Sequence, residues 1–209
     1  MKAISLISRR SDLTPAEFRA YYENTHCWLA MQHFPYRRYT RNHVLAASGA
    51  VDFDCLSEFA MDPGFDGRAV MQSRSRALLV DDEKEFMDPA QIRVAGAEEI
   101  PLHGSPIDGG TRHVLALQRG DLDDGDFRRQ VDLLGQKLVH LPDVRHASLD
   151  LIHGAGFPFA ALIWLTLDGD APLRLPPGLP LAERTTQLTV ATHATPEAVL
   201  RQHHVAYLP

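Results

Sequence analysis

The segment TPAEFRAYYENTHCWLAMQHFPYRRYTRNH, from Thr14 to His43, says most about how this chain folds. Thr14 is a typical N-cap, Pro15 suits the first helical position, and Glu17 stands where the partner of a capping box is found. Pro35 ends the helical pattern, because proline has no N–H for the helix. The segment therefore predicts a helix with a well-defined start, followed by a strand.

One face of this helix is aromatic and imidazole where a buried face is usually aliphatic. At about 100° per residue, one arc contains Phe18, Tyr21, Tyr22, Thr25, His26, Leu29 and His33. Such a face suits a cavity that binds a ring-shaped ligand and moves a proton, because histidine titrates near neutrality. The alternative is a set of ordinary core residues whose polar tips bond to the backbone.

The composition indicates a globular protein without a nucleic-acid partner. The 209 residues are 44% hydrophobic and carry a formal charge of −6, with no dense run of Lys and Arg. Cys27 and Cys55 are isolated, and the sequence begins MKAISLISRR without a long apolar segment. We expect a cytoplasmic protein with reduced thiols that does not associate with membranes.

The first half of the chain alternates strands and helices in the order β-α-β-β-α-β. Strands are predicted at 2–8, 36–46, 53–59 and 92–98, with a second helix from 64 or 66 to about 79. This order is that of a ferredoxin-like α+β sandwich, in which two helices cover one face of an antiparallel sheet. We expect one such domain over residues 1–100.

The pattern begins again after a Pro- and Gly-rich segment, PLHGSPIDGG, which predicts a linker at 101–110. Strands follow at 111–118, 144–152, 159–167 and 185–192, with helices at 123–138 and from 195 onward. Residues 33–49, HFPYRRYTRNHVLAASG, align without a gap with residues 140–156, HLPDVRHASLDLIHGAG. Residues 170–183 contain too much proline for a normal helix. Residues 111–209 are therefore predicted to be a degenerate second repeat with a C-terminal tail.

Two tandem ferredoxin-like repeats can bury their open sheet faces by packing them together within one chain. We therefore expect an α+β fold in which two antiparallel sheets pack face to face as an internal, barrel-like pseudo-dimer. A folded monomer is feasible, and exposed edges leave room for a homodimer.

The chemistry is expected in the first repeat, because the second has Leu133 or Gly135 in place of His26. Strand alternation puts Tyr39 and His43 on one face, and they approach His26 if that face lies under the helices.

An acidic residue of the third predicted strand is a candidate partner for a histidine. Asp54 and Glu58 share one face of that strand, and either carboxylate could orient a histidine ring. The alternative for both is a salt bridge with a neighbouring arginine at the strand edge.

No metal or cofactor is expected. His26 and His33 lie two turns, or about 10 Å, apart, too far to share one ion. The remaining histidines form no HxH or HExxH group, and no phosphate loop or dinucleotide fingerprint is present.

Four segments carry a resemblance to a known family: LISRRSDLTPAEFRAYYENTHCWLA, YRRYTRNHV, FDCLSEF and EKEFMDPAQIRV. Over about residues 1–100 the chain resembles the EthD family of the dimeric α/β barrel superfamily. Similar members dehydrate, decarboxylate or cyclise polyphenolic polyketides, or are encoded with systems that degrade ethers or aromatic compounds. The resemblance implies a general acid/base role for His26, assigns Tyr39 and His43 to the strand motif, and matches Asp54 and Asp88 to recurrent acidic positions.

The sequence departs from the family pattern beside the histidine of the helix. Cys27, Trp28 and Leu29 stand where a small residue, proline and leucine are common, and Tyr22 replaces a frequent tryptophan. These changes alter the shape of the expected cavity.

The predicted function is that of a cofactor-independent lyase, isomerase or cyclase acting on an aromatic, polyketide-like or β-keto small molecule. The predicted catalytic residues are His26, Tyr39, His43 and Asp54. The predicted substrate-binding residues are Phe18, Tyr22, Leu29, His33 and Glu58. Two alternatives remain: a non-catalytic binding protein of an aromatic or ether degradation pathway, and a cofactor-free or haem-linked monooxygenase of the same superfamily.

Overall fold

The computed structural model describes residues 2–65, 72–169, 172–202 and 208–209. The chain divides into two compact units. The first unit consists of residues 1–43, 52–94 and 194–209, and the second unit of residues 44–51 and 95–193. Both contain antiparallel strands and helices, which confirms the predicted α+β class.

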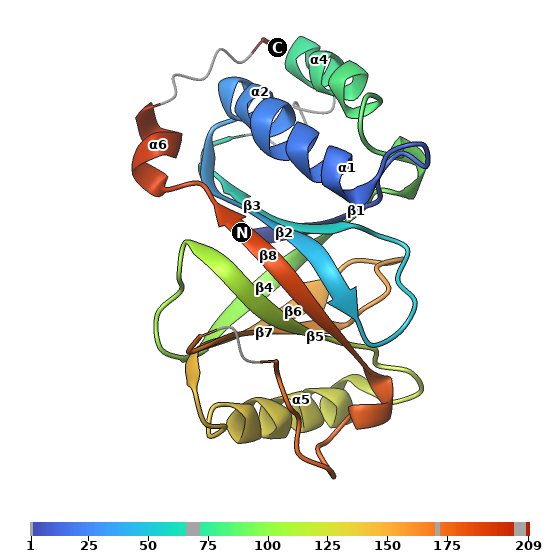
Figure 1. Ribbon diagram of the computed structural model, residues 1–209, viewed down its shortest axis with the longest axis vertical. Helices are drawn as coiled ribbons and strands as arrows, with labels where there is room; N and C mark the ends of the chain where they lie inside the picture. The colour runs from blue at the N-terminus through green and yellow to red at the C-terminus, as the bar shows by residue number, and fades with distance from the viewer. Residues whose placement is uncertain (1, 66–71, 170–171, 203–207) are drawn as a thin grey trace. The chain divides into compact units, whose positions relative to one another are not determined.

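The first unit is a three-stranded antiparallel sheet with helices over one face (Figure 1). β3 lies between β1 and β2. The strands are β1 (Lys2–Ile7), β2 (Tyr36–Ala47) and β3 (Cys55–Met61). The helical segments are α1 (Pro15–Tyr21), the π-helical turn η1 (Tyr22–His26), α2 (Cys27–His33), α4 (Arg74–Glu83), the 3-10 turn η2 (Pro89–Gln91) and α6 (Glu197–Gln202). The core of the unit fills the space between these helices and the sheet, with Phe18, Tyr22 and Phe86 almost fully buried.

The predicted start of the first helix is confirmed. The backbone N–H of Glu17 donates to Oγ1 of Thr14, and the backbone N–H of Thr14 donates to Oε2 of Glu17 at 2.8 Å. This capping box satisfies N–H groups that the first helical turn otherwise leaves without partners.

After Tyr22 the predicted helical arc is only partly correct, because the chain forms a π-helical turn there; His26 and His33 are buried as expected. A π turn holds more residues than an α turn, so it rotates every later side chain relative to an unbroken α-helix. Thr25 is exposed and Leu29 only half-buried, whereas Cys27 and Ala30 face the core.

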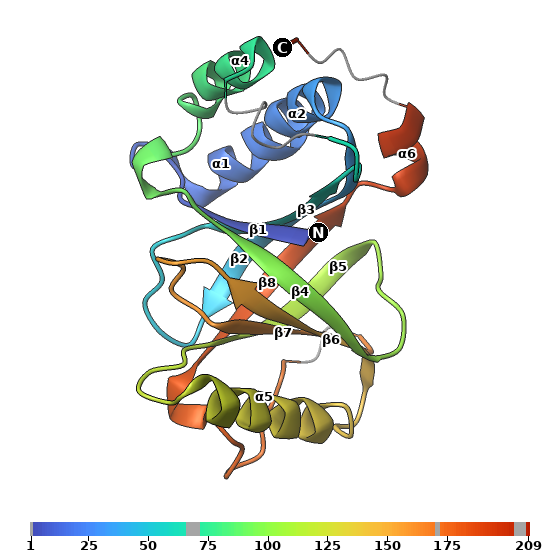
Figure 2. The ribbon, with the colours of Figure 1, turned by 180° about the vertical axis from the view of Figure 1, so that it is seen from behind.

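The second unit is a five-stranded antiparallel sheet with a helix, α5 (Asp124–Leu138), along one face (Figure 2). Its strand order is β4-β6-β7-β5-β8. The strands are β4 (Arg93–His103), β5 (Gly109–Leu117), β6 (Val144–His153), β7 (Ala161–Leu167) and β8 (Thr185–Ala194). Val131, Leu134 and Leu138 of α5 pack on the sheet and are almost fully buried.

The strands and helices follow the predicted order, but the predicted linker and the second predicted helix have different bounds. β4 runs on to His103 and β5 begins at Gly109, so half of the predicted 101–110 linker is strand. The pairing of β4 shifts register between Pro101 and His103, and such an irregularity accommodates a proline that cannot donate to the ladder. The predicted helix at 64–79 is α4, which begins at Arg74, and residues 66–71 lie outside the described part of the chain.

The C-terminal segment belongs to the first unit rather than the second. Leu200 of α6 is buried in the first-unit core. Of residues 172–181, none is helical, and a short 3-10 turn, η3 (Ala182–Arg184), precedes β8. The tandem duplication, the domain limits at 100 and 111 and the face-to-face packing of two sheets remain predictions.

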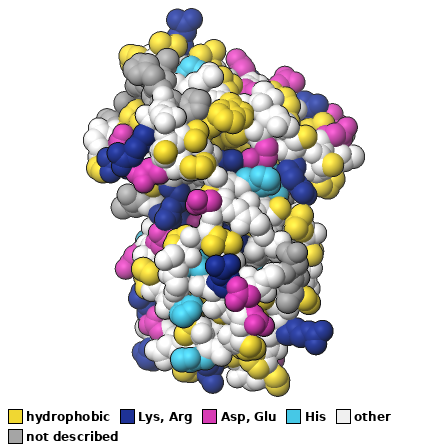
Figure 3. All heavy atoms as spheres, turned by 60° about the vertical axis from the view of Figure 1, so that its left-hand side comes forward, with side chains coloured by type: hydrophobic (Ala, Val, Ile, Leu, Met, Phe, Trp, Pro, Cys, Tyr) yellow, Lys and Arg dark blue, Asp and Glu magenta, His cyan; other side chains and the backbone are white. Residues whose placement is uncertain are grey.

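The surface carries both signs of charge. On the face drawn in Figure 3, acidic and basic side chains are intermixed. Within the described residues, no helix combines the length and the apolar character needed to cross a membrane.

Candidate active site

A cavity of about 870 Å³ lies in the first unit, lined by residues of the sheet, of η1 and of α4, and by residues of the segments that connect them. Its walls are largely aromatic and aliphatic. The aromatic rings include those of Tyr22, Phe34, Tyr36, Tyr39, Phe59 and Phe65. This volume and composition are typical of a site for a small organic molecule.

His26 lines the cavity and is held by a carboxylate behind it. Its Nδ1 lies 2.6 Å from Oδ2 of Asp82, and the hydroxyl of Tyr21 donates to Oδ1 of the same carboxylate at 2.9 Å. Burial favours a raised pKa for Asp82, but the hydrogen bonds from His26 and Tyr21 outweigh it and hold that pKa below its ordinary value. An ionised Asp82 accepts the proton of Nδ1, so Nε2 is the basic nitrogen of His26.

Aromatic rings fix the position of the histidine ring. The His26 centroid lies 4.8 Å from that of Phe86 and 5.1 Å from that of Tyr22. Both neighbours are almost fully buried, and His26 is only 5% exposed. A ring confined in this way keeps one orientation towards a ligand, which general acid/base catalysis requires.

Three hydroxyl groups form a second polar feature of the cavity wall. The Tyr22 hydroxyl hydrogen-bonds to those of Tyr39 and Ser57. Burial raises the pKa values of Tyr22 and Tyr39 well above their ordinary values, so both phenols keep their protons and can donate them. The Tyr36 ring stacks on that of Tyr39 with centroids 4.7 Å apart, which restricts the motion of this wall.

An ion pair on α4 is a third polar feature of the lining. Arg76 donates to both carboxylate oxygens of Glu83 at 2.6 and 2.8 Å. A bidentate pair of this kind neutralises both charges and keeps a fixed geometry.

Of the residues predicted from the sequence, His26, Tyr22 and Tyr39 line the cavity. His43 shares a strand face with Tyr39, as predicted, but its Nε2 lies 2.7 Å from Oε1 of Glu23 and it is not part of the lining. The ring of His43 is directed to a carboxylate on the helix instead of to a ligand.

The carboxylates predicted to orient the histidine lie elsewhere. Asp54 accepts from the backbone N–H of Arg9 at 2.9 Å and pairs with its guanidinium. Glu58 pairs with Lys2 at 2.6 Å on the face of the sheet opposite the helices. Strand alternation explains this result, because Ser57 and Phe59 line the cavity and Glu58 between them must point away.

Asp82 orients His26, and sequence reasoning missed it. It lies in α4, which runs to Glu83, whereas the sequence pattern predicts that this helix ends near Leu79. Spacing was the one signal that could have found it, since Leu79, Asp82 and Glu83 fall on one side of a helix.

The remaining predicted binding residues do not line the cavity. Phe18 packs in the core with its ring 5.6 Å from that of Phe86, and Nδ1 of His33 lies 3.0 Å from Oγ of Ser75. Leu29 is rotated away by the π-helical turn. No group of three or more His, Cys, Asp or Glu residues within the described part of the chain could hold a metal ion.

Comparison with known proteins bears out the predicted resemblance. Residues 10–90, which contain His26, Asp82 and the Tyr22 and Tyr39 pair, match the family model of the EthD domain. No curated protein matches the chain.

Two solved structures share the fold over nearly the whole chain. An anthrone oxidase-like protein is 14% identical, with a TM-score of 0.54, and the alignment covers 99% of this chain and 96% of that one. A "putative monooxygenase" from Lactobacillus acidophilus NCFM is 10% identical, with a TM-score of 0.53 and coverage of 94% and 95%. At these identities the likeness extends to the fold alone.

Proposed function

We propose, starting from the EthD domain formed by residues 10–90, that this protein is an enzyme that moves a proton on an aromatic small molecule. The reaction is of the lyase, isomerase or cyclase type, and the protein needs no cofactor for it. The observation that carries the proposal is the buried His26–Asp82 pair in the wall of an aromatic cavity. A histidine oriented by a carboxylate is the usual arrangement for general base catalysis.

In this proposal Nε2 of His26 removes a proton from a carbon next to a carbonyl or phenolic group. The electron pair moves onto the substrate oxygen, where the neutral hydroxyls of Tyr22 and Tyr39 donate hydrogen bonds to the developing charge. The imidazolium formed is stabilised by Asp82. The His26 imidazolium then returns the proton to another substrate atom or to a leaving hydroxyl group.

The cavity supports a substrate of one to a few fused rings. Its volume of about 870 Å³ is near the upper end of the usual range for small-molecule sites, which is about 300 to 1,000 Å³. Stacked aromatic walls favour planar ligands over flexible aliphatic chains.

Deuterium exchange tests the proton-transfer step even while the product is unidentified. Hydroxylated aromatic ketones and β-keto aromatic compounds are incubated with the protein in D₂O, and deuterium incorporation is followed by mass spectrometry. We expect exchange with the wild type and a loss of about 10²-fold or more in H26A, the usual share of general acid/base catalysis. H33Q is the matched control, since His33 lies on the same helix but contacts Ser75. Equal exchange in H26A and the wild type excludes the role of His26.

A second candidate is oxygenation, which the names of the two similar structures support. Removal of the same proton leaves an electron-rich anion that dioxygen can oxidise. The assay distinguishes the two by dioxygen uptake, measured with an oxygen electrode in the same incubations. If the aromatic compounds bind saturably but neither deuterium exchange nor dioxygen uptake occurs, the result favours a non-catalytic binding protein.

A further inference from the structure

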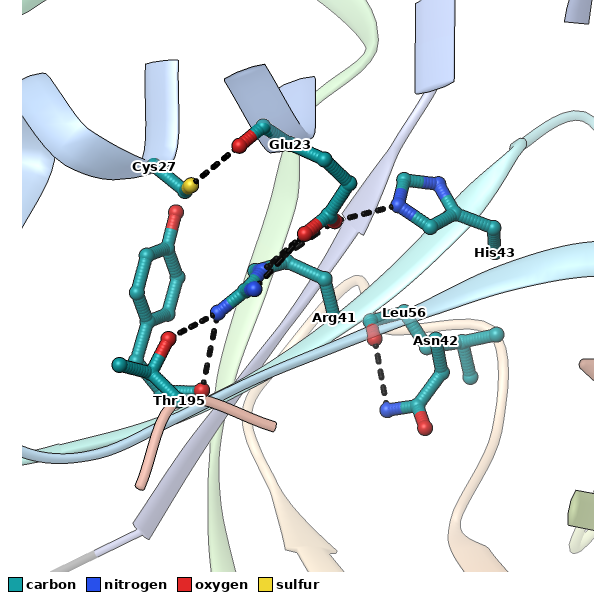
Figure 4. Close-up of polar contacts among 8 residues, drawn as sticks. Glu23, Cys27, Arg41, Asn42, His43, Leu56 and Thr195 are labelled. Carbon is teal, nitrogen blue, oxygen red and sulfur yellow. Dashed lines mark hydrogen bonds and ion pairs between the residues drawn. The ribbon is translucent and has the colours of Figure 1, made fainter. Parts of the chain in front are cut away.

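A second polar network begins on the π-helical turn, one residue from Tyr22. The Glu23 carboxylate lies between two basic side chains of β2, the guanidinium of Arg41 and the ring of His43 (Figure 4). It accepts from Nη2 of Arg41 at 2.7 Å and from Nε of the same group at 3.2 Å, and Nε2 of His43 lies 2.7 Å away. The network therefore links the turn to the strand that carries Tyr39.

The strand side of this network is itself anchored. Nη1 of Arg41 donates to the backbone carbonyl of Tyr39 at 3.1 Å and to Oγ1 of Thr195 at 2.6 Å (Figure 4). Arg41 is 5% exposed and His43 is 1% exposed. A charged group as buried as Arg41 remains stable only when it is well paired, so loss of one partner is costly.

The network contacts the one irregular turn of the cavity helix. Tyr22 and His26 are the two ends of this π-helical turn, and both line the cavity. π turns are rare and are frequently found at functional sites. If the turn relaxed to an α-helix, each later residue would rotate by about 100° relative to the sheet. Thr25 and Leu29 would then turn towards the inner face, and His26 and Ala30 would turn away from their present positions.

We propose that Glu23, acting through Arg41 and His43, is a positioning residue that holds the π-helical turn and so aims His26 and Tyr22 into the cavity. His43 has a positioning role in this scheme instead of a role at the substrate. The inference rests on the proposed function for its catalytic meaning, but its test needs no substrate.

The decisive variant is E23Q, which keeps the size of the side chain and removes the charge that binds both basic groups. Long-range ¹H–¹⁵N NMR of the histidine rings reports the tautomer of His26. We expect the wild type to have the Nδ1-protonated form, bonded to Asp82, and E23Q to lose that signal. A crystal structure of E23Q should have residues 22–26 as a regular α-helix, with His26 withdrawn from Asp82.

E58Q is the matched control. Glu58 is a carboxylate of the same unit that is even more buried than Glu23, and it pairs with Lys2 on the opposite face of the sheet. E58Q removes a buried ion pair of comparable kind but does not touch the turn. Its His26 signal should match that of the wild type, which separates positioning from a general loss of stability.

A milder variant covers the case in which E23Q does not fold. R41K keeps a positive charge on β2 but cannot form the two bonds to Glu23 and the bond to Thr195 together. We expect a partial shift of the His26 signal, and a Kd for 1,8-dihydroxyanthraquinone, used as a planar probe, at least about tenfold higher, because a misplacement near 1 Å is costly. The proposal is overturned if the folded variants keep the wild-type His26 tautomer and the π-helical turn. The NMR signal of His26, the crystal structure and the Kd of the probe do not depend on turnover. The positioning role of Glu23 can therefore be tested even if the deuterium exchange assay fails.

Discussion

At the scale of single residues, the pairing of His26 with Asp82 decides which nitrogen is basic. In D82N the amide group can donate to Nδ1, which moves the imidazole proton to Nε2 and removes the lone pair that the proposed base would use. We expect deuterium exchange to fall by about 10²-fold or more while the fold is kept. The measurement is the exchange rate beside the far-UV circular dichroism spectrum.

D81N is the control for this prediction. Asp81 is the neighbouring acid on α4, exposed and paired with Lys84. Loss of the Asp81 charge in D81N should leave the deuterium exchange rate unchanged. If D81N and D82N reduce exchange equally, the effect comes from α4 as a whole and not from the tautomer of His26.

Glu23 should also contribute to the pH dependence of stability. Burial favours a raised pKa, but hydrogen bonds from His43 and Arg41 outweigh it and lower the pKa of Glu23 from 4.5 to about 2. A carboxyl whose pKa is depressed in the folded state stabilises it fully above the unfolded value, and this contribution is lost as the pH falls from 4.5 to 2. The shift is worth about 3 kcal/mol.

Urea unfolding of the wild type and E23Q across this pH range tests the prediction. The wild type should lose more free energy of unfolding than E23Q between pH 4.5 and pH 2. Parallel curves for the two proteins would mean that Glu23 titrates in the folded state as it does in the unfolded chain.

At the scale of elements, the capping box should stabilise the helix that carries the site. Replacement of Thr14 by Ala removes the side-chain acceptor of the Glu17 N–H and should lower the free energy of unfolding by about 1 kcal/mol. T25A is the matched control, because Thr25 is an exposed threonine of the same helix and should cost less than about 0.5 kcal/mol. Equal losses of free energy of unfolding in T14A and T25A would mean that the Thr14 cap does not stabilise the helix.

The elements themselves could be predicted well where local signals are strong. The N-cap of the first helix, the strand after Pro35 and the helix opened by Asp123 lie where the sequence indicates. These features depend on residues a few positions apart. The π-helical turn could not be predicted, because residues distant in sequence, Arg41 and His43, contact its carboxylate.

At the scale of the whole molecule, the C-terminal segment completes the first unit. Leu200 is 6% exposed within the first-unit core, although it lies more than a hundred residues beyond the rest of that core. We expect L200A to lower the free energy of unfolding by about 2 kcal/mol or more, the usual cost of a buried Leu to Ala change. L45A, which removes a leucine that is 49% exposed, should cost far less. The free energy of unfolding of both variants is measured with urea. If L200A costs no more than L45A, the C-terminal segment does not stabilise the first unit.

The α+β class, the order of the elements, the EthD resemblance and the choice of His26 as the candidate base follow from the amino-acid sequence, because each depends on local pattern or motif. The groups that meet His26 emerge only when the chain is folded. Asp82 reaches it from a helix 56 residues away, while Asp54 and Glu58 are paired elsewhere. Local periodicity sets the face on which a side chain lies, whereas its partner is set by how the helices pack on the sheet.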